Sequence, residues 1–371
     1  MNTSAVSRTR IVAGIFLVAF IVVLFVFIRS KTITPNATKQ IRSAANPRTE
    51  DVQTVSNSVS VDSSNTSDPV IAAVGDMVPG TETHCSPTNC KQMIVSQLIL
   101  AMKPMYFFAL GDTQYEKGEY SDFLTYYNPS FGRLKAITRP AIGNHEYTDP
   151  AASSDPTKAG YWDYFNGIGN FSGIAGERDK GYYAFDVGTW RVYVLNTNCS
   201  EVGGCKAGSP QEIWLRTDLA ANPRQCQMMY YHHPYLSNDT REFSYYKDQY
   251  ALWQDFYQAG GDIVLTGHSH FYERFAPMNP DRQADPSYGI REIIVGTGGS
   301  NIYEPEQPLP LTEVQNGKTF GALKMVLHPA SYDWRFVPIP GQTFTDSGSQ
   351  ACHAAPPAGS TLSPTEVSTP P

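Results

Sequence analysis

Five short motifs in this chain place metal-binding side chains directly after apolar runs. They are GD at 75–76, GDTQY at 111–115, GNHE at 143–146, YHHP at 231–234 and GHSH at 267–270. Carboxylate, phenol, amide and imidazole groups together offer the oxygen and nitrogen ligands that metal ions take in proteins. Each motif alone is a weak signal, since a Gly-Asp pair is usually a turn. Five in succession are hard to explain as independent turns, so the sequence predicts a metal centre.

The apolar runs that precede these motifs are expected to be buried strands. Because open α/β sheets place their sites beyond the carboxyl ends of the strands, the five motifs are expected to meet at one edge. A helix is predicted at 91–102, a second begins at the capping box Ser209-Pro210-Gln211-Glu212, and a third covers 250–259. Strands dominate after residue 290. This order predicts an α/β (α+β) fold, a two-sheet β-sandwich flanked by helices.

The motif order GD, GD-x-x-Y, GNHE, H-x-P and GH-x-H resembles the calcineurin-like metallophosphoesterases, and in particular their purple acid phosphatase branch. Stretches such as GNHEY, GYWDYF, KGYYAFDVG, YERFAP and VGTGG are similar to bacterial acid phosphatase-like members. The resemblance covers residues 68–353 and implies the calcineurin-like metallophosphoesterase fold. Most of that superfamily has GD-x-H as its first motif, but Val78 stands at the His position here. The resemblance implies that Tyr115 supplies the missing ligand, as in purple acid phosphatases.

The resemblance also implies a ligand set for two metal ions. One ion would take Asp76, Asp112, Tyr115 and His270; the other would take Asp112, Asn144, His232 and His268, with Asp112 shared. A phenolate suits Fe³⁺, and imidazole with a neutral amide suits a divalent ion such as Fe²⁺, Zn²⁺ or Mn²⁺. The alternatives are that Tyr115 is a packed aromatic residue and that Asn144 caps a turn.

The implied reaction is that of an acid phosphatase, hydrolysis of phosphate monoesters by in-line attack of a metal-bound water or hydroxide. His145 is the candidate general acid, or else it only orients a ligand. Glu146 is expected to position His145 or a ligand by a hydrogen bond. His233 is expected to support the site or to contact substrate. Arg274 either forms a buried ion pair with Glu273 or contacts the phosphate.

Two other functions stay open: a phosphodiesterase or nucleotidase on the same scaffold, and a surface interaction protein with a relic site. A formal net charge of −7 argues against general nucleic-acid binding, so the expected partner is a small phosphate ester. The sequence predicts no oligomeric state.

Residues 11–28, IVAGIFLVAFIVVLFVFI, are long enough and apolar enough to cross a bilayer. They predict a single-pass signal-anchor that follows a short cytoplasmic N-terminus at 1–10, while secretion after signal cleavage is the alternative. Residues 29–67 are rich in Ser, Thr and Asn and predict a disordered tether. Residues 354–371 predict a disordered Pro/Ser/Thr-rich tail. The catalytic domain would occupy 68–353.

All six cysteines lie within that domain, and an even number beyond a membrane anchor indicates disulfides in an extracytoplasmic compartment. Fifteen pairings are possible. Short spacing favours Cys85 with Cys90 and Cys199 with Cys205, which leaves Cys226 with Cys352. Six free thiols in a cytosolic enzyme are the alternative. A zinc site is disfavoured because no C-x₂-C spacing occurs.

Overall fold

The computed structural model describes residues 68–80, 86, 88–239, 245–360 and 362, all within one compact unit, Ser64–Pro371. The predicted N-terminus, signal-anchor and tether therefore lie outside the described residues, and so do residues 363–371 of the predicted tail. No helix in the described part of the chain is both long and apolar enough to span a membrane.

The first of two large sheets has six strands in the order β15-β14-β13-β1-β2-β3. Its strands are β1 (Val70–Val74), β2 (Tyr106–Leu110), β3 (Thr138–Ala141), β13 (Gly321–Leu327), β14 (Ser331–Pro338) and β15 (Ser347–Ala351). Strands β1, β2 and β3 run parallel, whereas β13 pairs with β1 in the antiparallel sense. The first two strands have the bounds that the sequence predicts.

The second sheet has seven strands in the order β12-β10-β11-β9-β8-β7-β6. Its strands are β6 (Tyr183–Val187), β7 (Trp190–Val194), β8 (Gln227–Tyr230), β9 (Ile263–Thr266), β10 (Tyr272–Phe275), β11 (Arg291–Val295) and β12 (Thr312–Asn316). Strands β7, β8, β9 and β11 are parallel, and β6 with β7 forms the predicted hairpin.

Helices join these strands and cover both sheets. They are α1 (Lys91–Met102), α2 (Tyr120–Asp122), α3 (Asn144–Tyr147), α4 (Gly160–Asn166), α5 (Pro210–Ala221) and α6 (Tyr245–Gln258), with short helical turns at 123–127, 131–137 and 156–158 and a small hairpin of β4 (Ser172–Gly173) and β5 (Gly176–Glu177). The predicted cap of α5 is confirmed, because the Ser209 hydroxyl accepts a bond from the Glu212 amide at 3.4 Å. Helix α6 begins five residues before its predicted start; its first turn contains polar Lys247 and Asp248, which give no apolar period.

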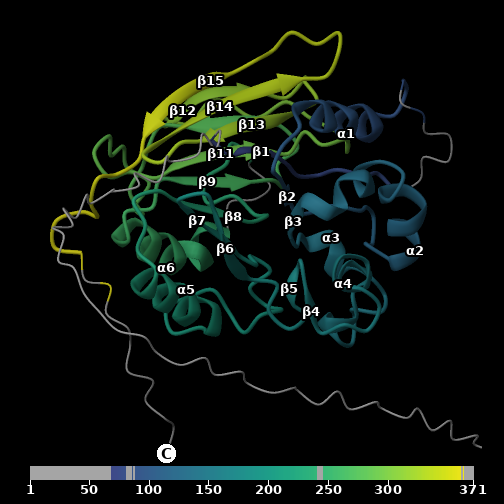
Figure 1. Cartoon of the computed structure of the whole chain (residues 1–371), viewed down its shortest axis with the longest axis horizontal. Helices are drawn as coiled ribbons and strands as arrows, with labels where there is room; N and C mark the ends of the chain where they lie inside the picture. Colours follow the sequence, from purple (N-terminus) through teal and green to yellow (C-terminus); the bar gives the residue numbers. More distant parts are fainter. Residues whose placement is uncertain (1–67, 81–85, 87, 240–244, 361, 363–371) are drawn as a thin grey trace, which may run out of the picture. The chain divides into compact units, whose positions relative to one another are not determined.

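The two sheets pack face to face, as a β-sandwich requires. Between them, Phe108 of β2 stacks on Tyr230 of β8 with ring centroids 4.7 Å apart. Helices α5 and α6 cover the outer face of the second sheet, where Trp253 and Leu215 pack with Met229 in a separate apolar cluster. Helix α1 packs beside the first sheet, with the other N-terminal helices nearby (Figure 1). The predicted sandwich with flanking helices is therefore confirmed.

Two of the predicted disulfides are confirmed. Cys199 bonds to Cys205 within one loop, and Cys226 bonds to Cys352 across 126 residues. Cys90 is also disulfide-bonded, but its predicted partner Cys85 lies outside the described residues. The bond to Cys352 attaches the end of the domain to the residue before β8.

Candidate metal centre

The five motifs follow the carboxyl ends of strands β1, β2, β3, β8 and β9. Asp76 and Asp112 each come two residues after their strand, Asn144 comes three residues after β3, and His232 and His268 each come two residues after theirs. The first three strands are adjacent and parallel in one sheet, and the last two are adjacent and parallel in the other. The strand ends therefore bring the motifs together, as predicted.

The backbone turns sharply at three of these positions. Asp76, Asp112 and His268 have φ values of 57°, 44° and 67°, in the left-handed region that non-glycine residues rarely adopt. Such conformations cost of order 1–3 kcal/mol each and gather at functional sites. The turns move each side chain out of its strand and toward the others.

A first cluster consists of Asp76, Tyr115 and His270. The Tyr115 hydroxyl lies 2.8 Å from Asp76 Oδ1 and 2.9 Å from His270 Nε2. His270 Nε2 lies 3.3 Å from the same carboxylate oxygen. Asp76 and Tyr115 are buried, and the His270 side chain is 19% exposed. These are three of the four residues predicted to share one ion.

A second cluster surrounds His232. Its Nε2 lies 3.1 Å from Asn144 Oδ1, 3.1 Å from His268 Nδ1 and 3.3 Å from Asp112 Oδ2. Asp112 also joins the clusters, because Asp76, Asp112 and His232 each offer a ligand atom within 4.8 Å of the other two. All seven predicted ligands thus lie together, with Asp112 between the two groups.

The donor atoms of both clusters suit metal ions. His232 Nδ1 donates to the Leu110 carbonyl at 2.9 Å, and His270 Nδ1 donates to the Asn301 carbonyl at 2.7 Å. Each ring therefore turns its Nε2 lone pair to the cluster, the arrangement typical of ligating histidines. Ligands about 2.1 Å from one ion lie roughly 3.0–3.4 Å apart, and the separations of 3.1–3.3 Å around His232 agree.

The electrostatics of the site also require positive charge. Burial, followed by the nearby Asp112 and Asp76, raises the pKa of Tyr115 well above its usual value. A phenolate at this position therefore needs a strong cation beside it. Burial opposes protonation of His232, but the adjacent Asp112 carboxylate raises the pKa of this imidazole to about 9. A metal ion would take the place of that proton.

Glu146 holds two of the ligand loops together. Its fully buried carboxylate accepts bonds from the amides of Asp112, Thr113, Gln114 and Gly143 and from the Thr113 hydroxyl, at 2.6–3.3 Å. Burial and the nearby Asp112 charge raise the pKa of Glu146. The five hydrogen-bond donors act in the opposite direction, because they favour the ionised carboxylate. The predicted positioning role of Glu146 is thus supported, through backbone amides rather than through His145.

His145 lies at the open side of the clusters, with 26% of its side chain exposed. Its Nδ1 donates to the Glu116 carbonyl at 2.6 Å, so Nε2 points inward and lies 3.9 Å from Asp112 Oδ2. The ring packs beside Tyr115, with centroids 4.3 Å apart. This position leaves Nε2 able to reach a molecule bound at the clusters.

The other candidate residues have different surroundings. Val78 is fully buried, and its carbonyl accepts a hydrogen bond from the Tyr115 amide at 2.9 Å. Val78 thus helps to position Tyr115, the residue predicted to supply the ligand that a His at position 78 supplies in most of the superfamily. His233 contacts the Thr197 hydroxyl at 2.9 Å and packs 4.5 Å from the His268 ring. Arg274 pairs with Asp346 at 2.7 Å and with Glu313, and not with Glu273. Neither the predicted pair with Glu273 nor a phosphate contact by Arg274 agrees with this arrangement.

Sequence reasoning missed the loop that follows β7. Its residues Thr197, Asn198 and Ser200 line a cavity of about 300 Å³ together with Asn144 and His233. The polar stretch NTNCS at 196–200 follows an apolar strand. The same pattern, an apolar run followed by polar residues, identified the other motifs, so it could have identified this loop as well. A larger cavity of about 490 Å³ lies at the ends of α5 and α6, and no predicted ligand lines it.

Comparison with known proteins gives one family match, to the description "Calcineurin-like phosphoesterase", over residues 70–272. Among curated proteins, purple acid phosphatase 21 of Arabidopsis thaliana is 29% identical over 164 residues, which are 41% of this chain and 36% of the relative. A second Arabidopsis thaliana protein, named "Probable inactive purple acid phosphatase 1", is 24% identical over 69% of this chain and 45% of the relative. The chain thus spans less than half the length of these relatives.

Among solved structures, the purple acid phosphatase PPD1 from seeds of yellow lupin (Lupinus luteus) has the same fold. It aligns with a TM-score of 0.62 and 19% sequence identity, over 78% of this chain and 54% of the lupin chain. At that identity the likeness concerns the fold alone.

Proposed function

Because the chain belongs to the calcineurin-like phosphoesterase family, we propose that it hydrolyses phosphate monoesters at a centre of two metal ions. The observation that carries the proposal is the pair of ligand clusters joined by Asp112. A shared anionic ligand offsets the repulsion between two cations about 3.5–4 Å apart. The relatives named purple acid phosphatases support the same branch.

Asp76, Tyr115 and His270 would hold one ion, Asn144, His232 and His268 would hold the other, and Asp112 would contact both. The bound ions would neutralise phosphate oxygens and lower the pKa of water at the site. The phenol of Tyr115 favours Fe³⁺ at the first position, while imidazole and amide favour Fe²⁺, Zn²⁺ or Mn²⁺ at the second.

The chain's own groups would orient the ester and complete the proton transfer. His145 Nε2 faces the clusters while its Nδ1 is fixed by the Glu116 carbonyl, so a proton on Nε2 can pass to the leaving oxygen. Glu146 keeps the loops of Asp112 and Asn144 at a fixed separation through the amides of Asp112 and Gly143. A relic site would have lost some of these groups, and all seven predicted ligand positions are occupied by ligating residue types.

The experiment that tests this proposal combines metal analysis, a visible spectrum and an ester assay of the purified chain. We expect two metal ions per chain, a phenolate-to-iron absorption band, and faster hydrolysis of p-nitrophenyl phosphate than of bis(p-nitrophenyl) phosphate. Tyr115→Phe keeps the ring and removes the hydroxyl that contacts Asp76 and His270, so it should abolish the colour.

Tyr127→Phe is the matched control. Its hydroxyl is buried and has no hydrogen-bond partner in the described part of the chain, so the colour should stay. A colourless wild type that holds two Zn²⁺ or Mn²⁺ ions would contradict the iron assignment but not the hydrolase. Faster cleavage of the diester would favour the phosphodiesterase alternative, and no cleavage of either ester would overturn the proposal.

We also propose that residues 11–28 anchor the domain outside the cytoplasm. The two described disulfides support an oxidising compartment. Protease added to intact cells should release the domain, because the 39-residue segment 29–67 would connect it to the bilayer. Release that occurs only after lysis would contradict the anchor topology. Release of the domain into the medium without protease would favour signal cleavage.

A further inference from the structure

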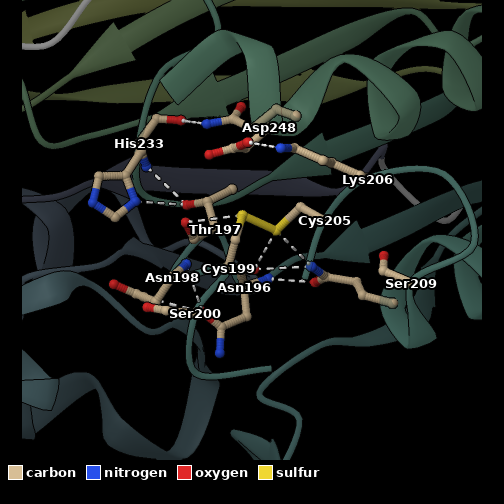
Figure 2. The surroundings of a disulfide bond; sticks show 12 residues. Asn196, Thr197, Asn198, Cys199, Ser200, Cys205, Lys206, Ser209, His233 and Asp248 are labelled. Atoms are coloured by element: carbon tan, nitrogen blue, oxygen red, sulfur yellow. Dashed lines mark hydrogen bonds and ion pairs between the residues drawn. A yellow bond between two sulfur atoms is a disulfide. The ribbon is translucent and has the colours of Figure 1, made fainter. Parts of the chain in front are cut away.

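A polar cavity of about 300 Å³ opens beside the second ligand cluster. Asn144 and His233 line it on the side of the metal centre, and Asn198, Ser200 and Asp248 line it elsewhere. A second hollow of about 460 Å³ shares Ser200 and Asp248 and includes Lys206. Figure 2 shows His233, Asn198, Ser200, Lys206 and Asp248 around the disulfide. The two hollows therefore adjoin each other, and the first lies next to the predicted site of ester cleavage.

The wall of this cavity is held firmly. The fully buried Gln211 side chain forms two hydrogen bonds with the backbone of Asn196. Gln211 Oε1 accepts from the Asn196 amide at 2.7 Å, and Gln211 Nε2 donates to the Asn196 carbonyl at 2.9 Å. The Asn196 side chain also binds the Tyr147 hydroxyl and the Lys180 carbonyl, at 2.9 and 3.0 Å. The Cys199–Cys205 disulfide closes the same loop (Figure 2). Such support keeps polar groups in place for recognition.

Asn198, Ser200 and Asp248 supply acceptor atoms at this cavity. Asn198 donates both amide hydrogens, to Asn196 Oδ1 at 3.0 Å and to the Ile142 carbonyl at 3.4 Å, so its Oδ1 can only accept. The Ser200 hydroxyl donates to Glu201 at 2.9 Å and keeps lone pairs as acceptors. Asp248 adds a carboxylate at the boundary of the two hollows, 3.1 Å from Lys206.

Charge and size restrict what this cavity can hold. The carboxylate of Asp248 is paired with Lys206 at 3.1 Å, so its repulsion of a second phosphate or carboxylate on the substrate is partly offset. None of the described residues that line the cavity is Phe, Tyr or Trp, so among them only the His233 imidazole offers a stacking partner for a nucleobase or an aryl ring. Its volume is at the lower end of the range for small-molecule sites, about 300–1,000 Å³.

We propose, resting on the proposed function, that this cavity binds the alcohol part of the substrate and selects small hydroxylated alkyl phosphates, the class of sugar and polyol phosphates. Substrate hydroxyls would donate to Asn198 Oδ1 and to the Asp248 carboxylate. A site built to accept hydroxyl hydrogens discriminates against an analogue that lacks them, because its polar groups are then left unpaired. Asn198 and Asp248 are therefore the residues that determine specificity.

The test compares kcat/KM for sn-glycerol 3-phosphate and for propyl phosphate, which has the same carbon chain without hydroxyls. We expect the wild-type, metal-loaded chain to favour the glycerol ester about tenfold or more. Asp248→Asn should reduce this ratio roughly three- to tenfold, because the amide replaces one acceptor oxygen by a donor. Asp186→Asn is the matched control, an exposed Asp paired with Arg191, and should keep the ratio.

The possible results distinguish failure of the specificity proposal from failure of the proposed phosphatase function. Equal rates on the two alkyl esters, with p-nitrophenyl phosphate still hydrolysed, would overturn the specificity proposal and leave the phosphatase intact. A preference for phosphoethanolamine that is lost in Asp248→Asn would also overturn it, since the cavity would then select an ammonium group. If no ester is hydrolysed by the metal-loaded chain, the proposed function is wrong and this proposal is wrong with it.

Discussion

Replacing Asp112 by Asn is expected to lower kcat for p-nitrophenyl phosphate by roughly 10³-fold or more. The side chain keeps its shape, but one oxygen that faces His232 or accepts the His145 amide becomes a donor. The change also removes the negative charge that the two ions would share. Metal ions supply several kcal/mol to phosphoryl transfer, and about 1.4 kcal/mol corresponds to a factor of ten in rate. Steady-state kinetics and metal content on the same preparation measure the effect.

Asp255→Asn is a suitable control for this substitution. Burial and the neighbouring Glu212 raise the pKa of Asp255 to about 8, so this carboxyl is mostly protonated below that pH. Exchange for an amide then changes little charge in acidic buffer, and Asp255 lies on α6 and is not one of the predicted ligands. Its rate and metal content should match those of the wild type. An Asp112→Asn protein that keeps both ions and its full rate would exclude Asp112 as the shared ligand.

His145→Ala is expected to slow hydrolysis of an alkyl phosphate about 10²–10⁴-fold, and hydrolysis of p-nitrophenyl phosphate much less. A nitrophenolate leaves as a stable anion, whereas an alkoxide needs a proton as its bond to phosphorus breaks. His145 can supply that proton from Nε2, because Nδ1 is already bonded to the Glu116 carbonyl. The measurement is kcat for the two esters in the variant and in the wild type.

Metal content separates the two interpretations of His145. Both ions should stay in His145→Ala, since the predicted ligand in this turn is Asn144. Equal rate losses on the two esters would indicate phosphate binding instead of proton donation, and loss of metal would show that His145 only supports the ligands. His328→Ala is the control, because this surface histidine pairs with Asp68 and Asp333 and contacts no predicted ligand.

The sequence predicted the strands that precede the motifs and the residues that the two clusters contain. The strands could be predicted because an apolar run that ends in Gly and a polar residue is a local pattern with one common outcome, a strand followed by a loop at the sheet edge. Asp76 and Asp112 are examples, each two residues beyond a buried strand. Family resemblance then supplied the partner of each ligand.

Long-range pairings could not be predicted in this way. The carboxylate of Glu146 bonds to amides 32–34 residues earlier in the chain, and backbone amides have no identity in a sequence. Arg274 pairs with Asp346, 72 residues away, rather than with its neighbour Glu273. The cavity wall at Asn198 faces Asp248 of a distant helix. Such contacts depend on how the elements pack, which no local pattern specifies.

The position of β1 has a consequence for biosynthesis. Asp76 follows the earliest strand, yet β1 lies between β2 and the late strand β13. Its turn is also held from the C-terminal side, because Gly75 donates to the Val295 carbonyl at 2.9 Å and Ser300 donates to the Asp76 carbonyl at 3.0 Å. A nascent chain that ends before Val295 thus lacks both contacts to the Asp76 turn, and one that ends before β13 still lacks a strand beside β1. Assembly of the first cluster is therefore expected to require synthesis of the chain through β13.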